Sequence, residues 1–250
     1  MKRKKVLITG AASGIGRASA IRFSNEGYDV CLNDLHYEKL LSVMAELSKG
    51  NHLVVLGNYS EKNTMIEGER IIKENWGELD VLINCAGIFE KTDAVEMDIQ
   101  QWRVVFDIML NGCLLVSQLA AKLMKNSGRI VHITSIHATR AEKYASSYST
   151  AKAAMNQYCR SLALELADKN ILVNAIAPGF VKTEMSIIDG ENELESQWFK
   201  DNYVNSYRLP LRRAAEAYEV AGVALFLAGN DSTYITGQVI IVDGGLSITF

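Results

Sequence analysis

The sequence has few cysteines, no excess of charge of one sign and no long apolar run. Its four cysteines, Cys31, Cys85, Cys113 and Cys159, are widely separated and form no CxxC pair. No histidine lies near them at the spacing of a zinc site. We therefore expect four small buried side chains in a reducing compartment, which points to the cytoplasm, and no metal site.

The charge balance and the hydropathy exclude further classes of partner. A formal net charge of -3 over 250 residues provides no electrostatic footprint for nucleic acid. No run approaches the roughly 18 consecutive apolar residues that a membrane-spanning helix needs. The basic start, residues 1–5, is followed by too few apolar residues for a signal sequence. We expect neither a nucleic-acid nor a membrane partner.

Short apolar, β-branched runs alternate with longer helical patterns along the whole chain. The expected strands are 5–9, 29–33, 53–57, 80–84, 129–134, 171–176 and 238–242. The expected helices are 14–26, 37–48, 61–76, about 99–125, 147–168 and 214–228. This alternation predicts an α/β fold, a doubly wound parallel sheet covered by helices on both faces, in a single domain over residues 1–250. Two segments interrupt it, a loop at 88–98 and an insertion at about 178–211.

A glycine-rich turn follows the first expected strand. Gly10, Gly14 and Gly16 have the spacing G-x-x-x-G-x-G, which differs from the G-x-G-x-x-G fingerprint of dinucleotide-binding proteins. Glycine lets a backbone approach a diphosphate closely, and the helix that starts here directs its free N–H groups to the same place. The turn is either purely structural or binds phosphate, and its position after the first strand favours phosphate.

Two more strand ends carry suitable residues. Asp34 follows the second strand, where a carboxylate accepts hydrogen bonds from both ribose hydroxyls of NAD and repels the 2′-phosphate of NADP. It therefore favours NAD, the alternative being a solvated loop aspartate. Asn84 opens a turn of small residues after the fourth strand. This turn either passes close to a flat ligand or is structural, and Asn84 is suited to tying neighbouring loops together.

Tyr148 and Lys152 are four residues apart on an expected helix and share one face. A phenol is a poor base at neutral pH, and a nearby ammonium favours its phenolate, so the pair suits proton transfer to or from an alcohol oxygen. Such pairs also occur by chance. Ser135, however, ends the fifth strand at the same sheet edge, and its hydroxyl is suited to holding a carbonyl or alkoxide oxygen. Asn111 is either an ordinary helix residue or positions a water beside Lys152.

Together these motifs resemble the short-chain dehydrogenase/reductase family along essentially the whole chain. The resemblance rests, in the family's order and spacing, on Thr9-Gly10-x3-Gly14-x-Gly16, Asn84-Cys85-Ala86-Gly87, Asn111, Ser135, Tyr148-x3-Lys152 and Pro178-Gly179 followed by Thr183. It implies a seven-stranded Rossmann-type sheet and hydride transfer between nicotinamide C4 and an alcohol or carbonyl carbon, without a metal.

The resemblance also implies roles for individual residues. Tyr148 is expected to be the general acid/base, and Ser135 to orient the substrate oxygen. Lys152 is expected to bind the nicotinamide ribose and lower the pKa of Tyr148, with Asn111 supporting a water relay. The residues expected to bind the cofactor are Gly10, Ser13, Gly14, Ile15, Gly16, Asp34, Asn58, Asn84, Ala86, Gly87, Tyr148, Lys152, Pro178, Gly179, Val181 and Thr183.

The sequence departs from the family's pattern at two positions. Cys85 replaces the second asparagine of the common Asn-Asn-Ala-Gly motif. Asn58 stands where an aspartate commonly meets adenine, and its amide oxygen is still able to accept that hydrogen bond. The closing motif at residues 242–245 also matches the family, and implies a homotetramer or a dimer.

The substrate is expected to be selected by the variable segment 136–144 and by the insertion. The residues expected to contact it are Ser135, His137, Tyr148 and Met185. The second half of the chain is similar to glucose-type sugar dehydrogenases, and the chain is also similar to 3-oxoacyl-thioester reductases. Those reductases usually prefer NADP, so Asp34 favours NAD-linked oxidation of a sugar, polyol or other secondary alcohol. The alternatives are the thioester reductase and a non-catalytic NAD-binding sensor or interaction module.

Overall fold

The structure, a computed structural model, describes residues 3–125, 127–188 and 190–249. Seven strands form one parallel sheet: β1 (Lys5–Thr9), β2 (Asp29–Asp34), β3 (Leu53–Leu56), β4 (Val81–Asn84), β5 (Gly128–Ile133), β6 (Ile171–Pro178) and β11 (Val239–Val242). Their order across the sheet is β11-β6-β5-β4-β1-β2-β3. Because the chain winds outward from β1 in both directions, a crevice opens beyond the carboxyl ends of β1 and β4. The predicted doubly wound sheet is confirmed.

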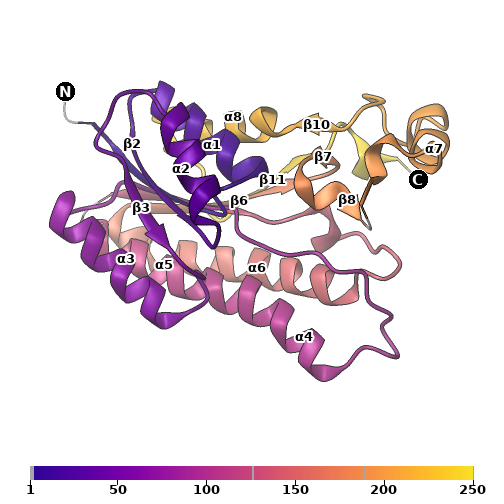
Figure 1. Ribbon diagram of the computed structural model, residues 1–250, viewed down its shortest axis with the longest axis horizontal. Coiled ribbons are helices and arrows are strands. Elements are labelled where there is room, and N and C mark those ends of the chain that lie inside the picture. Colours follow the sequence, from indigo (N-terminus) through magenta and orange to yellow (C-terminus); the bar gives the residue numbers. More distant parts are fainter. Residues whose placement is uncertain (1–2, 126, 189, 250) are drawn as a thin grey trace.

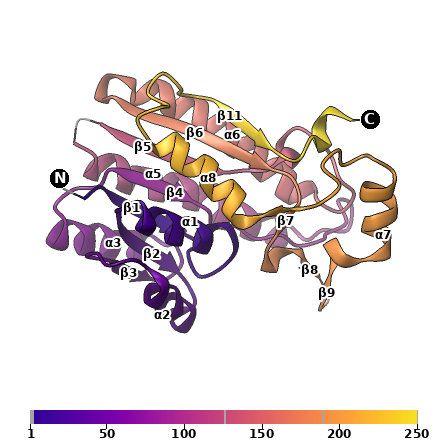
Figure 2. The same ribbon diagram turned by 90° about the horizontal axis from the view of Figure 1, so that it is seen from above.

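The helices cover both faces of this sheet (Figures 1 and 2). On one face lie α1 (Gly14–Asn25), α2 (Tyr37–Glu46) and α8 (Ala217–Ala228); on the other lie α3 (Lys62–Asn75), α4 (Ile99–Phe106), α5 (Gly112–Leu123) and α6 (Ser146–Glu165). The near-continuous apolar strands supply both cores. Ile8 and Ile83, for example, are fully buried under α1 and α8, and burial of such a side chain contributes about 1.5–3 kcal/mol.

One helix of the second face is unusually long. A capping box at Asp98 starts α4, and a π-helical segment (Asp107–Asn111) joins it to α5. Within the combined helix, Ile99–Leu123, an 18-residue window has a mean hydropathy of 1.7, so by length and composition alone the helix could cross a membrane. Because polar residues interrupt it, the helix contains no long uninterrupted apolar run. Met109, Val116 and Leu119 of this helix are buried in the cores of this fold, whereas Ile99 and Val104 are exposed.

The predicted insertion is a set of short elements at the carboxyl edge of the sheet. They are β7 (Val181–Lys182), a hairpin of β8 (Ile187–Ile188) and β9 (Glu191–Asn192), α7 (Gln197–Phe199) and β10 (Ala215–Glu216). Phe180, Phe199 and Tyr203 pack together with ring centroids 4.7–5.4 Å apart. Because Ala215 and Glu216 pair with β7, the last helix begins at Ala217 and not at Ala214 as expected.

Candidate active site

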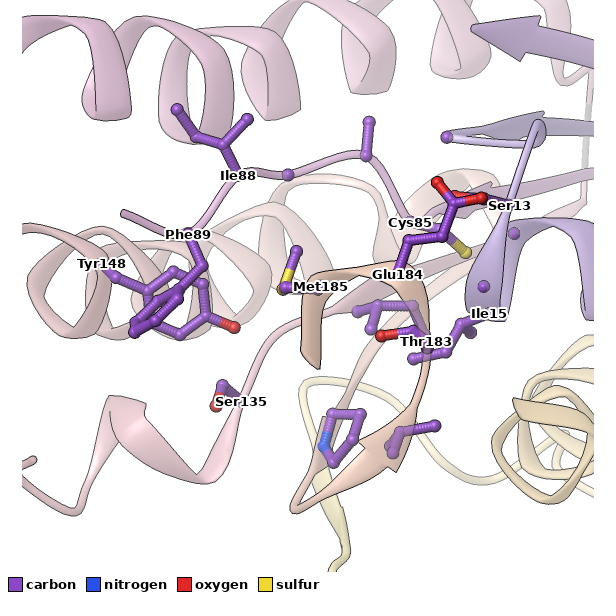
Figure 3. Close-up of a pocket in the computed structure, with 18 of the residues that line it drawn as sticks. Ser13, Ile15, Cys85, Ile88, Phe89, Ser135, Tyr148, Thr183, Glu184 and Met185 are labelled. Carbon is purple, nitrogen blue, oxygen red and sulfur yellow. The ribbon is translucent and has the colours of Figure 1, made fainter. Parts of the chain in front are cut away.

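A cavity of about 450 Å³ lies along the carboxyl edge of the sheet. The turns after β1, β4 and β5, the start of α6 and the insertion contribute to its walls. It is lined by every site residue predicted from the sequence except Asn84 and Asn111. Figure 3 shows Tyr148 and Ser135 on one side of it, Met185 near its centre, and Ser13 and Ile15 on the other.

The glycine turn is built for close approach of the backbone. A Cβ on Gly16 would lie 2.0 Å from the carbonyl oxygen of Gly10, and a Cβ on Gly10 would lie 2.9 Å from the backbone of Ala86. Ser13 is the N-cap of the 12-residue α1, and its side chain makes no capping hydrogen bond. The first N–H groups of α1 therefore face the cavity without a side-chain acceptor. A diphosphate fits these donors and the positive end of the helix dipole.

Asp34 lies at the next strand end, on the wall of the same cavity. Its Oδ2 accepts a hydrogen bond from the N–H of Ala12 at 3.1 Å, while Oδ1 accepts from Leu35 at 2.7 Å and His36 at 3.2 Å. The carboxylate is thus held in place by the turn on one side and by its own loop on the other. A fixed carboxylate beside the glycine turn fits the adenosine ribose of a dinucleotide.

The amide side chains of Asn58 and Asn84 are engaged within the protein. Asn58 lines the cavity, but its Oδ1 accepts from both the N–H and the hydroxyl of Ser60, at 3.0 and 2.8 Å. The oxygen expected to meet adenine is therefore already bonded. Asn84 is fully buried and accepts from the Thr9 hydroxyl at 2.6 Å. It ties β1 to β4, and it does not line the cavity.

Three groups predicted to carry the chemistry meet in the cavity. The Lys152 Nζ is 5.6 Å from the centroid of the Tyr148 ring and donates a hydrogen bond to the carbonyl of Ile133 at 2.8 Å. The Ser135 side chain lies near enough to the Tyr148 phenol to lower its pKa. All three side chains belong to buried residues. A phenol, a hydroxyl and an ammonium around one cavity are suited to proton transfer at a substrate oxygen.

Burial dominates the ionisation of this group. It raises the pKa of Tyr148 to about 12; the hydrogen bond with Ser135 lowers that pKa and the charge of Glu142 raises it. Burial also lowers the pKa of Lys152 to about 8. Burial, Ser135 and Glu142 are the causes of the Tyr148 shift in this structure, so the expectation that Lys152 lowers the pKa of Tyr148 stays a prediction.

The prediction for Asn111 is wrong. Asn111 is exposed, and its Nδ2 donates to Asp107 on its own helix at 2.7 Å. Met109, two residues earlier, is fully buried and packs in the cluster that contains Tyr148, whereas Asn111 is turned to solvent.

On the substrate side, His137 and Met185 line the cavity as predicted. The sequence analysis missed Glu142, whose Oε2 is 2.9 Å from Nε2 of His137. It also missed Lys91 and Glu193, which line the cavity and form an ion pair. The only signal for Glu142 in the sequence was its position within the variable segment 136–144.

An ion pair also joins two walls of the cavity. Lys39, in α2, donates from Nζ to both carboxylate oxygens of Glu184 at 2.8 and 2.9 Å. Glu184 begins the 3-10 turn Glu184–Ser186, which lines the cavity opposite the Asp34 loop. The ion pair therefore connects α2, the helix that follows β2, to the insertion.

Comparisons with known proteins agree with this architecture. A family model described as enoyl-(acyl carrier protein) reductase matches residues 10–247. The chain is 35% identical to a 3-oxoacyl-(acyl-carrier-protein) reductase of Thermotoga maritima, over 99% of both chains. It is 35% identical to a glucose 1-dehydrogenase of Gluconobacter oxydans, over 98% of this chain and 92% of the relative.

Solved structures give the same result. The aldohexose dehydrogenase of Thermoplasma acidophilum has a TM-score of 0.85 at 28% identity, covering 100% of this chain and 96% of the other. A short-chain type dehydrogenase/reductase from Mycobacterium marinum has a TM-score of 0.86 at 28% identity, covering 98% and 95%. Fold and sequence thus match the same group of enzymes over nearly their full lengths.

Proposed function

Because this chain belongs to the short-chain dehydrogenase/reductase family, whose enzymes act on CH–OH or carbonyl groups with a nicotinamide cofactor, we propose that it transfers a hydride between NAD and a secondary alcohol or its ketone. We propose a sugar or polyol as the alcohol. The observation that carries this proposal is the meeting of Tyr148, Ser135 and Lys152 in the cavity that also contains the glycine turn.

Each of these side chains has a distinct task in the proposed reaction. During oxidation the Tyr148 oxygen takes the proton from the substrate hydroxyl, and during reduction it returns it. The Ser135 hydroxyl hydrogen-bonds the substrate oxygen and fixes its position beside Tyr148. The ammonium of Lys152 stabilises the phenolate that forms and binds a ribose hydroxyl. The nicotinamide, when bound, takes up or supplies the hydride.

Binding of the dinucleotide is assigned to the other end of the cavity. The N–H groups at the start of α1 are proposed to hold the diphosphate, and Asp34 the adenosine ribose. The anionic carboxylate of Asp34 supports NAD over NADP. The relative named as a glucose 1-dehydrogenase and the aldohexose dehydrogenase structure support a sugar or polyol.

A 3-oxoacyl-thioester reductase is a second candidate, supported by the identity with the Thermotoga maritima enzyme. The two candidates differ in cofactor and in substrate size. A panel of sugars, polyols, hydroxysteroids and acyl thioesters, followed by NADH absorbance with both NAD and NADP, separates them. Faster turnover of the acyl thioesters with NADP would replace the first candidate by the second.

The catalytic assignment is tested by Tyr148→Phe. We expect kcat to fall roughly 10²- to 10⁴-fold, the usual contribution of a positioned acid/base, while NADH binding measured by fluorescence stays nearly unchanged. Tyr218→Phe, on the exposed side of α8, is the matched control and retains activity. Retention of turnover by Tyr148→Phe would refute the mechanism. A wild type without turnover on the whole panel would instead favour a non-catalytic binding module.

We also propose self-association as a homotetramer or dimer. Large apolar side chains are exposed near the C-terminal end, including Ile241 at 52% and Ile248 at 81% exposure. Light scattering after size exclusion tests the proposal, and a monomer at micromolar concentration would refute it.

A further inference from the structure

A polar pair lies next to the reacting groups. His137 is in the 3-10 turn Ile136–Ala138, and its ring meets the Tyr148 ring edge-on at 5.8 Å between centroids. The backbone N–H of His137 donates to the Ser135 hydroxyl oxygen at 3.1 Å. Its Nε2 lies 2.9 Å from Oε2 of Glu142, and both side chains line the cavity. The turn after β5 therefore connects the reacting groups directly to a carboxylate.

Glu142 is an ionised group that ligands can reach. Its hydrogen bond with His137 lowers the pKa of the Glu142 carboxyl, burial opposes this shift, and the charge of Lys91 adds to it. The side chain is 39% exposed, in contrast to 19% for His137. Its charge raises the pKa of Tyr148, which places it within electrostatic reach of the phenol. Glu142 is thus a carboxylate at the reacting end of an open cavity.

The hydrogen-bonding capacity of this carboxylate is only partly used. Within the described residues, Oε2 interacts with His137, whereas no hydrogen bond to Oε1 is found. Nδ1 of His137 is buried and has no hydrogen-bond partner among the described residues, so the ring holds Glu142 through Nε2. An ionised carboxylate only accepts hydrogen bonds, and the ligand group that satisfies Oε1 must be a donor.

We propose that Glu142, held by His137, binds a hydroxyl group adjacent to the reacting carbon, so that the enzyme selects 1,2-diols and their α-hydroxy ketones, polyols and sugars included. This inference rests on the proposed function. In oxidation the reacting carbon loses a hydride and its oxygen passes a proton to Tyr148. The neighbouring hydroxyl keeps its proton and donates it in a hydrogen bond to Glu142.

The charges around the cavity favour a neutral ligand of this kind. Lys91, on the cavity wall, is paired with Glu193, and Lys39, outside the lining, is paired with Glu184, so neither ammonium is free for an anionic ligand. Lys143 also lines the cavity, and its Nζ lies 4.8 Å from the ring centroid of Tyr144. A carboxylate at the reacting end disfavours an anionic substituent there through repulsion. A 3-oxoacyl thioester offers a carbonyl acceptor next to the reacting segment, and an acceptor cannot bond to Glu142.

The test compares substrates that differ by one hydroxyl. Wild-type enzyme and Glu142→Gln are assayed for NAD reduction with 2-butanol and 2,3-butanediol, and for NADH oxidation with butanone and 3-hydroxybutanone. We expect wild type to prefer the hydroxylated member in kcat/KM. Glu142→Gln should lose roughly 10- to 150-fold of that preference, the value of one hydrogen bond to a charged group. Activity on the simple alcohol should change little.

A matched variant controls for the charge change. Glu90→Gln makes the same substitution at an exposed position that does not line the cavity, and it should keep the full preference. If Glu142→Gln lowers kcat/KM equally for both members of a pair, or keeps the wild-type preference, the inference is overturned. If the wild type has the same kcat/KM for both members, the inference is also overturned, but the proposed function remains intact. Absence of turnover of any alcohol or ketone would instead remove the proposed function itself.

His137 is a positioning residue in this proposal, because it acts through Glu142. His137→Gln should raise KM for 2,3-butanediol more than it lowers kcat, since it loosens the carboxylate but keeps the serine, tyrosine and lysine. A purely structural role predicts equal effects on 2-butanol and the diol, and that outcome would exclude His137 from recognition.

Discussion

The choice between NAD and NADP should depend on Asp34, and two substitutions separate its charge from its hydrogen bonds. Asp34→Asn removes the negative charge but keeps an oxygen that accepts from Leu35 and His36. Asp34→Ala removes the charge and leaves three backbone N–H groups, including that of Ala12, without this acceptor. Comparing the two variants distinguishes electrostatic selection from support of the loop.

The size of the effect follows from the position of Asp34. Two unit charges 4 Å apart interact by about 1 kcal/mol in water and about 4 kcal/mol at an effective dielectric constant of 20. Asp34 is half-buried on the cavity wall, which lies between these limits. Its repulsion of a 2′-phosphate should therefore favour NAD by roughly 5- to 1,000-fold in kcat/KM, since each 1.4 kcal/mol corresponds to about tenfold.

The assay is steady-state kinetics with each dinucleotide at saturating alcohol. Asp34→Asn should narrow the ratio of kcat/KM for NAD to that for NADP by at least about fivefold, mostly through a lower KM for NADP. Asp34→Ala should weaken binding of both dinucleotides, because the turn at Ala12 loses its anchor. Asp231→Asn, an exposed position away from the cavity, should change nothing. A ratio that is the same in Asp34→Asn as in wild type would refute electrostatic selection by Asp34.

Two further predictions concern folding and the cofactor turn. Gly16→Ala should abolish dinucleotide binding and destabilise the fold, since its Cβ would lie 2.0 Å from the Gly10 carbonyl oxygen. Gly222→Ala, in α8 with open space around it, should instead stabilise the fold by about 0.5–1 kcal/mol. Thermal melts measure the stability of both variants, and NADH titration measures their dinucleotide binding. Burial lowers the pKa of His132 to about 4, so between pH 6.5 and 4 the unfolded chain binds a proton that the native state does not, and stability falls as the pH falls. His132→Asn should flatten that part of the pH dependence in urea unfolding by up to about 3 kcal/mol, and an unchanged slope would contradict the prediction.

The parallel sheet was predictable because its strands are near-continuous apolar runs, without an alternation of apolar and polar residues. The eight residues of β6 are all buried, and a run of that kind fits only a strand covered on both faces. The ends of elements were less predictable. Pairing with β11 carries β6 on to Pro178, and pairing with β7 delays the start of α8. These are contacts between segments far apart in the chain, which a local pattern does not contain.

The catalytic site was partly predictable for a similar reason. Tyr148 and Lys152 are fixed relative to each other by helical spacing, and Ser135 by the end of a strand. Asn111 is the last residue of a π-helical segment, whose wider turn changes which residues face α6. Glu142 depends on a loop in which Tyr144 adopts a left-handed φ of 66°. Neither the wider turn nor that loop conformation has a signature in the sequence.

The ion pair between Lys39 and Glu184 joins the insertion to α2, and its strength follows from its exposure. Both side chains are about half exposed, 48% and 60%, and an ion pair in such surroundings is worth about 0–1 kcal/mol. Its closed form is therefore favoured over the open one by no more than about fivefold. Thermal motion opens this contact frequently, and added salt weakens it. The ion pair therefore restrains the insertion only weakly and does not by itself limit the exchange of bound molecules.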